Sequence, residues 1–235
     1  MKIKAVLFDL DATLLQMDQD KFLKAYFGGV VKRVSQNGYD PQTFLKFFYA
    51  GIKDMVANNG EHTNEYVFWK RMKDGYGDGV RELEAIFDKF YNEEFDTYKD
   101  ICEYTEKSRK VVLKVKKMGY IAALATSPLY PVVATKKRIS WAGLTSEDFA
   151  FITTYENSSY AKPNPEYFKF VAESIGCKPC ECLMVGNDTS DDFGAIESGM
   201  KLFLLTNCLI NTQNIDISDL PHGDFEALEG YINNL

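Results

Sequence analysis

Two acidic residues near the amino terminus have the types and the spacing that could do chemistry. Asp9 and Asp11 are separated by one residue and follow an apolar run, 5–8, which indicates a short buried strand. Two carboxylates this close repel one another, and a divalent cation offsets that repulsion; oxygen ligands favour magnesium. A polar turn that merely closes a strand would use the same residue types. The rest of the chain must therefore distinguish chemistry from a turn.

Other polar residues stand at comparable places further along the chain. Each group follows an apolar run or precedes an expected helix: Thr126 with Ser127, Lys162, and Asn187 with Asp188 and Asp192. The carboxyl ends of parallel strands meet at one edge of a sheet. We therefore expect these side chains to lie close to Asp9 and Asp11.

The combined set is suited to phosphoryl transfer. A carboxylate can attack phosphorus to form a covalent intermediate, while a metal, a lysine and a hydroxyl hold the phosphate oxygens. A second acid can protonate the leaving oxygen and later activate water. Each residue alone also has a structural interpretation: Lys162 as a solvated lysine at a helix start, Thr126 as a strand cap, and Asp188 and Asp192 as an acidic turn favoured by a helix dipole.

The hydrophobic pattern predicts which elements position these residues. Four segments with helical spacing fill residues 20–98, and we interpret their aromatic stripes as core rather than as a ligand site. From residue 105 onward helices alternate with apolar strands, expected near 120–125, 149–153, 182–186 and 201–205. Such alternation predicts an α/β fold with a Rossmann-like parallel sheet. We expect a core domain of residues 1–15 and 105–235, and an inserted helical cap domain of residues 16–104 that could close over a substrate.

Composition limits the possible partners and locations. The chain has 235 residues, 46% of them hydrophobic and 26% charged, which is typical of a globular protein. A net charge of -7 argues against nucleic-acid or anionic-membrane binding, and no apolar run is long enough to span a membrane. Acids interrupt the first apolar segment, so we expect no signal peptide and a cytoplasmic protein with reduced cysteines. Three of the five cysteines form a C-x-x-C-x-C cluster (177, 180, 182), which lacks a fourth zinc ligand nearby.

Taken together and in this order, the polar groups resemble the motifs of the haloacid dehalogenase-like (HAD) hydrolase superfamily. They are Asp9-x-Asp11-x-Thr13, Leu124-Ala125-Thr126-Ser127, Ala161-Lys162-Pro163-x-Pro165 and Val185-Gly186-Asn187-Asp188-x-x-x-Asp192. The resemblance covers residues 1–15 and 105–206, and the helical insertion matches by position and class only.

This resemblance implies a role for each matching residue. Asp9 would be the nucleophile that becomes phosphoaspartate, and Asp11 would be the general acid and base, with its backbone carbonyl on magnesium. Thr126 and Ser127 would bind the phosphoryl group, and Lys162 would stabilise that group and the nucleophile. Asp188 would complete the metal site beside Asp9. Asn187 could assist, and Asp192 would support the metal from a greater distance, for example through water.

Two residues depart from the family pattern. Ala12 stands where the family usually has glycine, and we infer a backbone there that tolerates alanine. Ser127 replaces a common asparagine, which changes the hydrogen bond expected at that position. Neither substitution removes a catalytic group.

The leading hypothesis is a magnesium-dependent phosphatase acting on a small phosphorylated metabolite. A 2-haloacid dehalogenase of the same superfamily would need neither a metal nor Asp11. A phosphosugar mutase, a phosphonatase with a Schiff-base lysine in the cap, and a non-catalytic binding module are alternatives, although the last would typically have lost Asp9. The sequence does not distinguish a monomer from a dimer. It offers candidates for substrate contact in the cap without a basis for choosing among them: Tyr49, Asn58, His62, Trp69 and Arg71.

Overall fold

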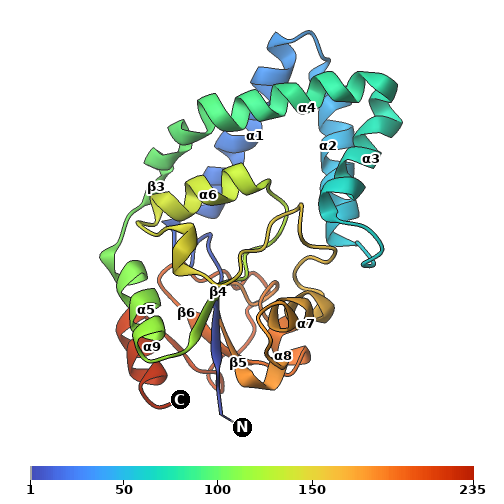
Figure 1. The fold of residues 1–235 in the computed structure, drawn as a ribbon. Helices are drawn as coiled ribbons and strands as arrows, with labels where there is room; N and C mark the ends of the chain where they lie inside the picture. The colour runs from blue at the N-terminus through green and yellow to red at the C-terminus, as the bar shows by residue number, and fades with distance from the viewer. Residues whose placement is uncertain (1) are drawn as a thin grey trace.

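A five-stranded parallel sheet confirms the predicted α/β class in the computed structural model, which describes residues 2–235 (Figure 1). The strands, in sheet order, are Ile121–Leu124 (β4), Ala5–Phe8 (β1), Cys182–Gly186 (β5), Lys201–Leu205 (β6) and His222–Gly223 (β7). β1 occupies a central position, because Phe8 is paired with Leu124 of β4 and with Val185 of β5. The polar residues that follow these strands consequently start from the same edge of the sheet.

Helices cover both faces of the sheet. They are Glu106–Lys117 (α5), Val132–Trp141 (α6), Pro165–Ser174 (α7), Gly194–Glu197 (α8) and Phe225–Ile232 (α9). Val6 and Phe8 belong to a buried cluster that includes side chains of α5 and α9, whereas Ala5 and Leu7 belong to a second cluster with α7 and α8. This alternation is the period of two expected of a strand that is buried on both faces.

The residues between β1 and α5 form a helical block above the sheet edge (Figure 1). Its helices are Gln19–Gln36 (α1), Pro41–Val56 (α2), Asn64–Tyr76 (α3) and Val80–Lys89 (α4). Local sequence explains their starts. The Asp18 and Asp40 carboxylates and the Thr63 hydroxyl each accept a backbone N–H of the first turn, and Pro41 occupies the first helical position of α2.

Three predictions about secondary structure were wrong, two on the bounds of helices and one on the presence of a strand. The last of the four helical segments expected over residues 20–98 ends as an α-helix at Lys89 and continues as a π-helical turn, Phe90–Glu94, and a 3-10 helix, Phe95–Ile101. Residues 149–153 form no strand, and only Ile152 makes an isolated bridge with Leu124. α7 begins at Pro165 and not directly after Lys162, because Asn164 caps it by accepting the N–H of Glu166. Tertiary contacts override the local pattern at the first two positions, whereas a local cap sets the third.

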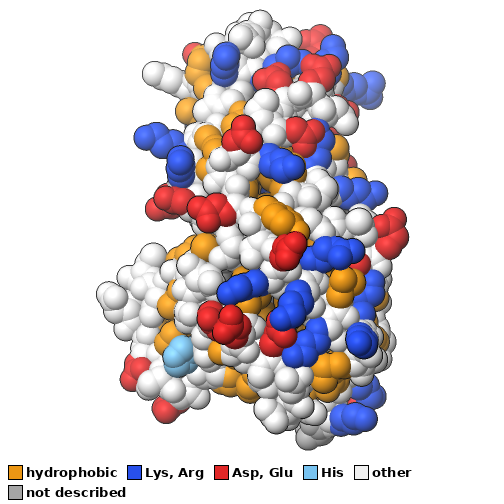
Figure 2. Space-filling view, turned by 90° about the vertical axis from the view of Figure 1, so that its left-hand side faces the viewer, with side chains coloured by type: hydrophobic (Ala, Val, Ile, Leu, Met, Phe, Trp, Pro, Cys, Tyr) orange, Lys and Arg blue, Asp and Glu red, His pale blue; other side chains and the backbone are white. Residues whose placement is uncertain are grey.

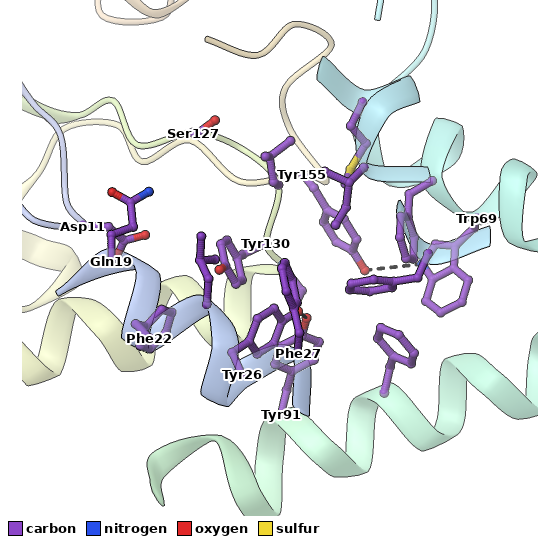
Figure 3. Close-up of a pocket in the computed structure, with 18 of the residues that line it drawn as sticks. Asp11, Gln19, Phe22, Tyr26, Phe27, Trp69, Tyr91, Ser127, Tyr130 and Tyr155 are labelled. Atoms are coloured by element: carbon purple, nitrogen blue, oxygen red, sulfur yellow. Dashed lines mark hydrogen bonds between the residues drawn. The ribbon is translucent and has the colours of Figure 1, made fainter. Parts of the chain in front are cut away.

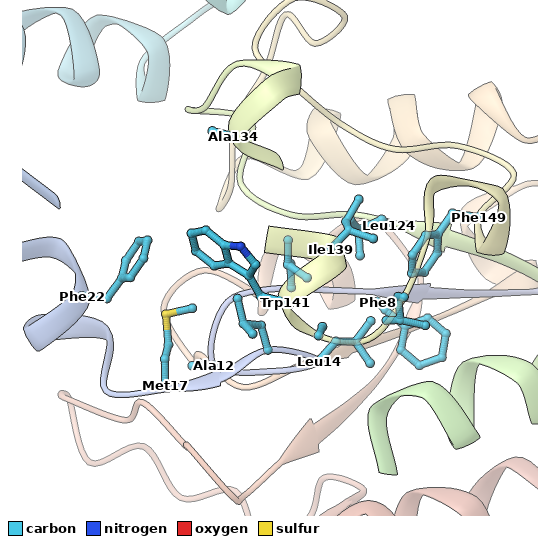
Figure 4. Close-up of a cluster of buried hydrophobic side chains, with 14 of the residues drawn as sticks. Phe8, Ala12, Leu14, Met17, Phe22, Leu124, Ala134, Ile139, Trp141 and Phe149 are labelled. Carbon is cyan, nitrogen blue, oxygen red and sulfur yellow. The ribbon is translucent and has the colours of Figure 1, made fainter. Parts of the chain in front are cut away.

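The helical block is joined to the sheet at two places. Gln16–Met17 (β2) pairs antiparallel with Cys102–Glu103 (β3), so the chain enters and leaves the block side by side. On α3, the buried Asn64 side chain donates to the carbonyl oxygens of Pro128 and Tyr160, both at 3.2 Å. The apolar cluster is also continuous across this junction, from Phe8 and Leu124 through Trp141 to Phe22 of α1 (Figure 4).

On the face drawn in Figure 2, acidic and basic side chains are intermixed over the upper part, whereas Lys and Arg side chains gather at the lower right. No helix in the described part of the chain, residues 2–235, is long and apolar enough to cross a membrane. All five cysteines are free thiols.

Candidate active site

The buried pair of Asp9 and Lys162 forms the centre of the site. Lys162 Nζ lies 2.8 Å from Asp9 Oδ1 and 2.8 Å from Asp192 Oδ1, and the lysine side chain is almost fully enclosed. The other oxygen of Asp9 lies 3.2 Å from the Thr13 hydroxyl, which also lies 2.9 Å from Asn187 Oδ1. Thr13 and the distant Lys162 therefore fix the Asp9 carboxylate directly, and Asn187 and Asp192 in turn hold these two side chains.

Burial and charge act in opposite directions on this pair. Burial alone would lower the pKa of Lys162, but the Asp192 and Asp9 carboxylates outweigh it and raise that pKa above its ordinary value. Burial raises the pKa of Asp9, and the attraction of Lys162 opposes that rise. Lys162 is therefore a permanent cation here, while Asp9 needs positive charge nearby to remain ionised.

Asp192 holds the lysine and the loop after β5 in place. Its second oxygen, Oδ2, accepts the backbone N–H groups of Asn187 and Asp188, each at 3.0 Å. A side chain at Gly186 would collide with this carboxylate, so the close approach requires glycine. Both oxygens of Asp192 are thus already engaged within the protein.

Asp188 and Asn187 differ in what they offer to a ligand. Asp188 is partly exposed, and its Oδ1 accepts the N–H groups of Ser190 and Asp191 at 2.7 and 3.3 Å, which orients the carboxylate. The Asn187 side chain is buried, with its Oδ1 near Thr13 and its Nδ2 donating to the Cys208 carbonyl at 2.8 Å. Asp188 is available for a ligand, whereas Asn187 ties two loops together.

Thr126 and Ser127 follow β4 and lie around the same cavity as Asp9 and Asp188. The Thr126 backbone carbonyl accepts hydrogen bonds from the Thr153 hydroxyl at 2.7 Å and from the Tyr167 hydroxyl at 2.8 Å. A small cavity of about 40 Å³ is lined by all the predicted site residues, namely Asp9, Asp11, Thr126, Ser127, Lys162, Asn187, Asp188 and Asp192, together with Gln19 and Asp191. The fold therefore brings the whole predicted set together, and we refer to this space as the phosphoryl cavity.

Asp11 has a partner that the sequence interpretation missed. Arg138 of α6 is fully buried, donates through Nη1 to Asp11 Oδ2, and stacks its guanidinium 4.0 Å from the centre of the Tyr130 ring. Asp11 Oδ1 is buried and has no hydrogen-bond partner among residues 2–235. The helical spacing of α6 could have identified this residue. Arg138 follows Ala134 by four residues and precedes Trp141 by three, which places it on the buried side of the helix.

The inference about Ala12 was wrong. This residue has φ of +57°, in the left-handed region where a side chain is disfavoured by about 1 kcal/mol or more. The loop around it is closed by hydrogen bonds from Ala12 N to Leu15 O and from Leu15 N to Leu10 O, each at 2.8 Å. The turn that carries Asp11 therefore imposes the conformation, and the alanine is strained in it rather than tolerated.

A second, larger cavity of about 230 Å³ adjoins the phosphoryl cavity. Among the cap candidates, Trp69 lines this second cavity (Figure 3). Asn58, His62 and Arg71 instead line a separate pocket at the helical block, and Tyr49 is exposed. The structure thus separates candidates that the sequence left equivalent.

Comparison with known proteins shows the family. The model for haloacid dehalogenase-like hydrolases matches residues 6–205. A pyrophosphatase PpaX of Bacillus cereus (strain AH820) is 26% identical over 201 residues, which cover 86% of this chain and 82% of that protein.

Solved structures support the same fold. A predicted phosphoglycolate phosphatase from Haemophilus somnus 129PT aligns with a TM-score of 0.61 and 20% identity, covering 99% of both chains. A β-phosphoglucomutase from Clostridium difficile aligns with a TM-score of 0.60 and 16% identity, covering 99% of this chain and 96% of that one. With the family model spanning both the sheet and the helical insertion, the chain belongs to the haloacid dehalogenase-like hydrolases.

Proposed function

We propose that this hydrolase is a magnesium-dependent phosphatase that acts on a small phosphorylated metabolite through a phosphoaspartate at Asp9. The observation that carries the proposal is the buried Asp9 carboxylate, which has Lys162 Nζ at 2.8 Å and opens on a cavity shared with Asp11, Thr126 and Asp188. A carboxylate nucleophile beside a fixed cation is suited to the transfer of a phosphoryl group through a covalent intermediate. The pyrophosphatase relative supports phosphate chemistry.

The proposed reaction has two steps. An Asp9 oxygen attacks phosphorus and the bond from phosphorus to the ester oxygen breaks. Asp11, which enters this step protonated on Oδ1, gives that proton to the departing ester oxygen. Water then attacks the phosphoaspartate, Asp11 takes its proton, and phosphate and the Asp9 carboxylate are released. The buried and unpartnered Asp11 Oδ1 is the atom we assign to these proton transfers.

The donor set fits magnesium. No three His, Cys, Asp or Glu side chains form a metal cluster within residues 2–235, and Mg²⁺ typically uses one or two carboxylates with waters and substrate oxygens. Asp9 and Asp188, with the Asp11 carbonyl, would hold it. When bound, the ion would offset negative charge on the phosphoryl oxygens and favour the ionised form of Asp9. Asp192 would act indirectly, because its oxygens are occupied by Lys162 and two amides.

We further propose that residues 16–104 are a cap domain and residues 1–15 with 105–235 the core. Both connections pass through the short β2–β3 ribbon, which is the geometry of a hinge. Closure of the helical block would exclude water from Asp9 during the first step.

Phosphate release from p-nitrophenyl phosphate tests this function. We expect release that depends on added Mg²⁺ and falls at least about a thousandfold in Asp9→Asn, since the nucleophile is lost. Asp20→Asn, an exposed change of the same kind on α1, should retain activity. Full activity in Asp9→Asn, or no hydrolysis by the unaltered protein across a broad panel of phosphorylated metabolites, would contradict the mechanism. Assaying sugar phosphates for isomerisation would identify a mutase.

Asp11→Asn tests the proton carrier separately. We expect turnover to fall about 10²- to 10⁴-fold, with labelled phosphate accumulating on the protein because the second step lacks its base. Metal binding, measured by titration calorimetry, should persist, since the backbone carbonyl remains. Unchanged turnover would remove Asp11 from this role.

A further inference from the structure

The larger cavity beside Asp11 has an aromatic interior. It lies between the helical block and the loop after β4, and Figure 3 shows it running from Asp11 and Gln19, past Tyr130, to Trp69. Its aromatic lining comes from α1, α2, α3, α4, the π-helical turn Phe90–Glu94 and two loops: Phe22, Tyr26, Phe27, Phe48, Phe68, Trp69, Phe87, Tyr91, Tyr130 and Tyr155. The sequence interpretation of these stripes as core was incomplete, because the same rings also form the wall of a cavity. We refer to it as the aromatic cavity.

The aromatic cavity adjoins the phosphoryl cavity. Four residues line both: Asp11, Gln19, Ser127 and Asp191. A phosphate ester bound at Asp9 would therefore direct its departing alcohol, which Asp11 must protonate, into the aromatic cavity. The lining of that cavity consequently bears on the identity of the alcohol.

The aromatic cavity contains no cation for a second anionic group. None of its lining residues is Lys, Arg or His. The nearby Arg138 is fully buried, paired with Asp11 and covered by the Tyr130 ring. Lys162 is held by Asp9 and Asp192. A carboxylate or a second phosphate in the aromatic cavity would lose its hydration without gaining a partner, which is costly.

The acidic residues of the lining lie apart from one another, and the walls between them are apolar or aromatic. Asp11 and Asp191 lie at the end shared with the phosphoryl cavity, and Asp11 is already paired with Arg138. Asp88 of α4 is exposed to solvent. The tyrosine hydroxyls of these walls bond within the protein, such as Tyr26 with Tyr91 at 2.5 Å and Tyr155 with Trp69 at 3.4 Å.

We propose that the substrate is a phosphate monoester of an aromatic or apolar alcohol, with no second anionic group. This inference rests on the proposed phosphatase function. An apolar cavity of about 150 Å³ holds one benzene molecule, so the 230 Å³ here accommodate a substituted or two-ring group. Pyrophosphate and phosphoglycolate, whose departing groups are anions, fit this lining poorly.

The test compares kcat/KM for 1-naphthyl phosphate, phosphoglycolate and inorganic pyrophosphate with Mg²⁺ present. We expect 1-naphthyl phosphate to be preferred over each anionic substrate by at least about tenfold, the minimum effect of a missing partner for a buried charge. Trp69→Ala should lower the ratio of naphthyl to phosphoglycolate kcat/KM about tenfold, since ring contacts are lost. Tyr66→Ala, an exposed aromatic change on the same helix α3, is the matched control and should leave the ratio unchanged.

Binding of 1-naphthol, measured by titration calorimetry, is independent of hydrolysis. We expect the unaltered protein to bind it and Trp69→Ala to bind about tenfold more weakly. If no ester is hydrolysed, the proposed function is wrong, and the naphthol titration alone decides whether the cavity accepts aromatic groups. Hydrolysis that favours either anionic substrate, or no naphthol binding, would overturn the inference while leaving the phosphatase function intact.

Discussion

Asp11 and Arg138 show how a single buried pair constrains the chemistry of the site. Arg138 neutralises Asp11 Oδ2 and is itself covered by Tyr130, so the guanidinium is removed from contact with a ligand. The free oxygen, Oδ1, faces no partner within the described chain. In the proposed reaction, Arg138 is therefore a positioning residue for Asp11 rather than a group that touches substrate.

Replacing Arg138 should lower the stability of the folded protein. Arg138→Met leaves the Asp11 charge without its partner, and we expect the free energy of unfolding to fall by about 3–5 kcal/mol. Adding Asp11→Asn to the same chain should recover a large part of that loss, because the uncompensated charge is removed. Urea denaturation measures both effects. Arg33→Met, which breaks surface pairs with Glu93 and Glu94, should cost about 1 kcal/mol or less. A similar loss in both single variants would contradict the argument.

At the scale of elements, β1 positions the site because it has partners on both sides and helices on both faces. Its pairing to β4 and β5 puts Asp9 beside the loops that carry Thr126 and Asp188. The helices keep this register through apolar contacts and a few fixed polar ones. Among the latter, Glu229 of α9 accepts from Lys110 and Lys114 of α5 at 3.1 and 3.3 Å.

The Glu229 contact predicts a pH-dependent contribution to stability. Burial would raise the pKa of Glu229, but its hydrogen bonds to Lys110 and Lys114 lower it overall. A carboxyl with a lowered folded-state pKa stabilises the protein above its unfolded pKa and loses that effect as the pH falls through the folded value. Glu229→Gln should cost about 0.5–1 kcal/mol at pH 7.

Thermal unfolding measured from pH 7 down to pH 3 should show the difference between Glu229→Gln and the unaltered protein shrinking on acidification. Glu226→Gln, at the exposed pair with Lys107, serves as the control and should have little effect at any pH. A difference that grew as the pH fell would have the wrong sign for this explanation.

For the whole molecule, the helical block and the sheet are joined by polar contacts as well as by a continuous apolar cluster. Asn64 N donates to Ser158 O at 2.8 Å, and its buried side chain donates to two carbonyls and accepts from Asn58 Nδ2 at 2.8 Å. These bonds lie away from the β2–β3 ribbon. Opening about that ribbon would therefore require Asn64 to leave its partners.

Asn64→Ala should weaken this junction. Two carbonyls and the Asn58 amide would lose a buried partner, and we expect the free energy of unfolding to fall by about 1–3 kcal/mol. Hydrogen exchange should also become faster at the start of α3, since its backbone bonds to Ser158 and Tyr155 open more often. Asn59→Ala, in the exposed neighbouring loop, is the control. Unaltered exchange and stability in Asn64→Ala would show that the junction depends on apolar contacts alone.

Much of the fold and of the site could be predicted from local patterns. Short apolar runs ending on Asp9, Thr126 and Asp188 mark strands whose side chains meet at one edge, because parallel strands share a direction. Caps such as Asp40 followed by Pro41 mark helix starts, because their chemistry acts within one turn. The α/β class and the family follow from these features, since each depends on residues close together in the sequence.

Only the tertiary structure decided the features that depend on distant contacts. Arg138 as the partner of Asp11, the positive φ of Ala12 and the division of Asp192 between Lys162 and two amides could not be read from spacing. The aromatic stripes were compatible with a filled core, and only the packing of four helices and a π-helical turn against two loops leaves a cavity between them. Periodicity specifies which face of a helix is apolar, whereas the space between faces is set by how the elements pack.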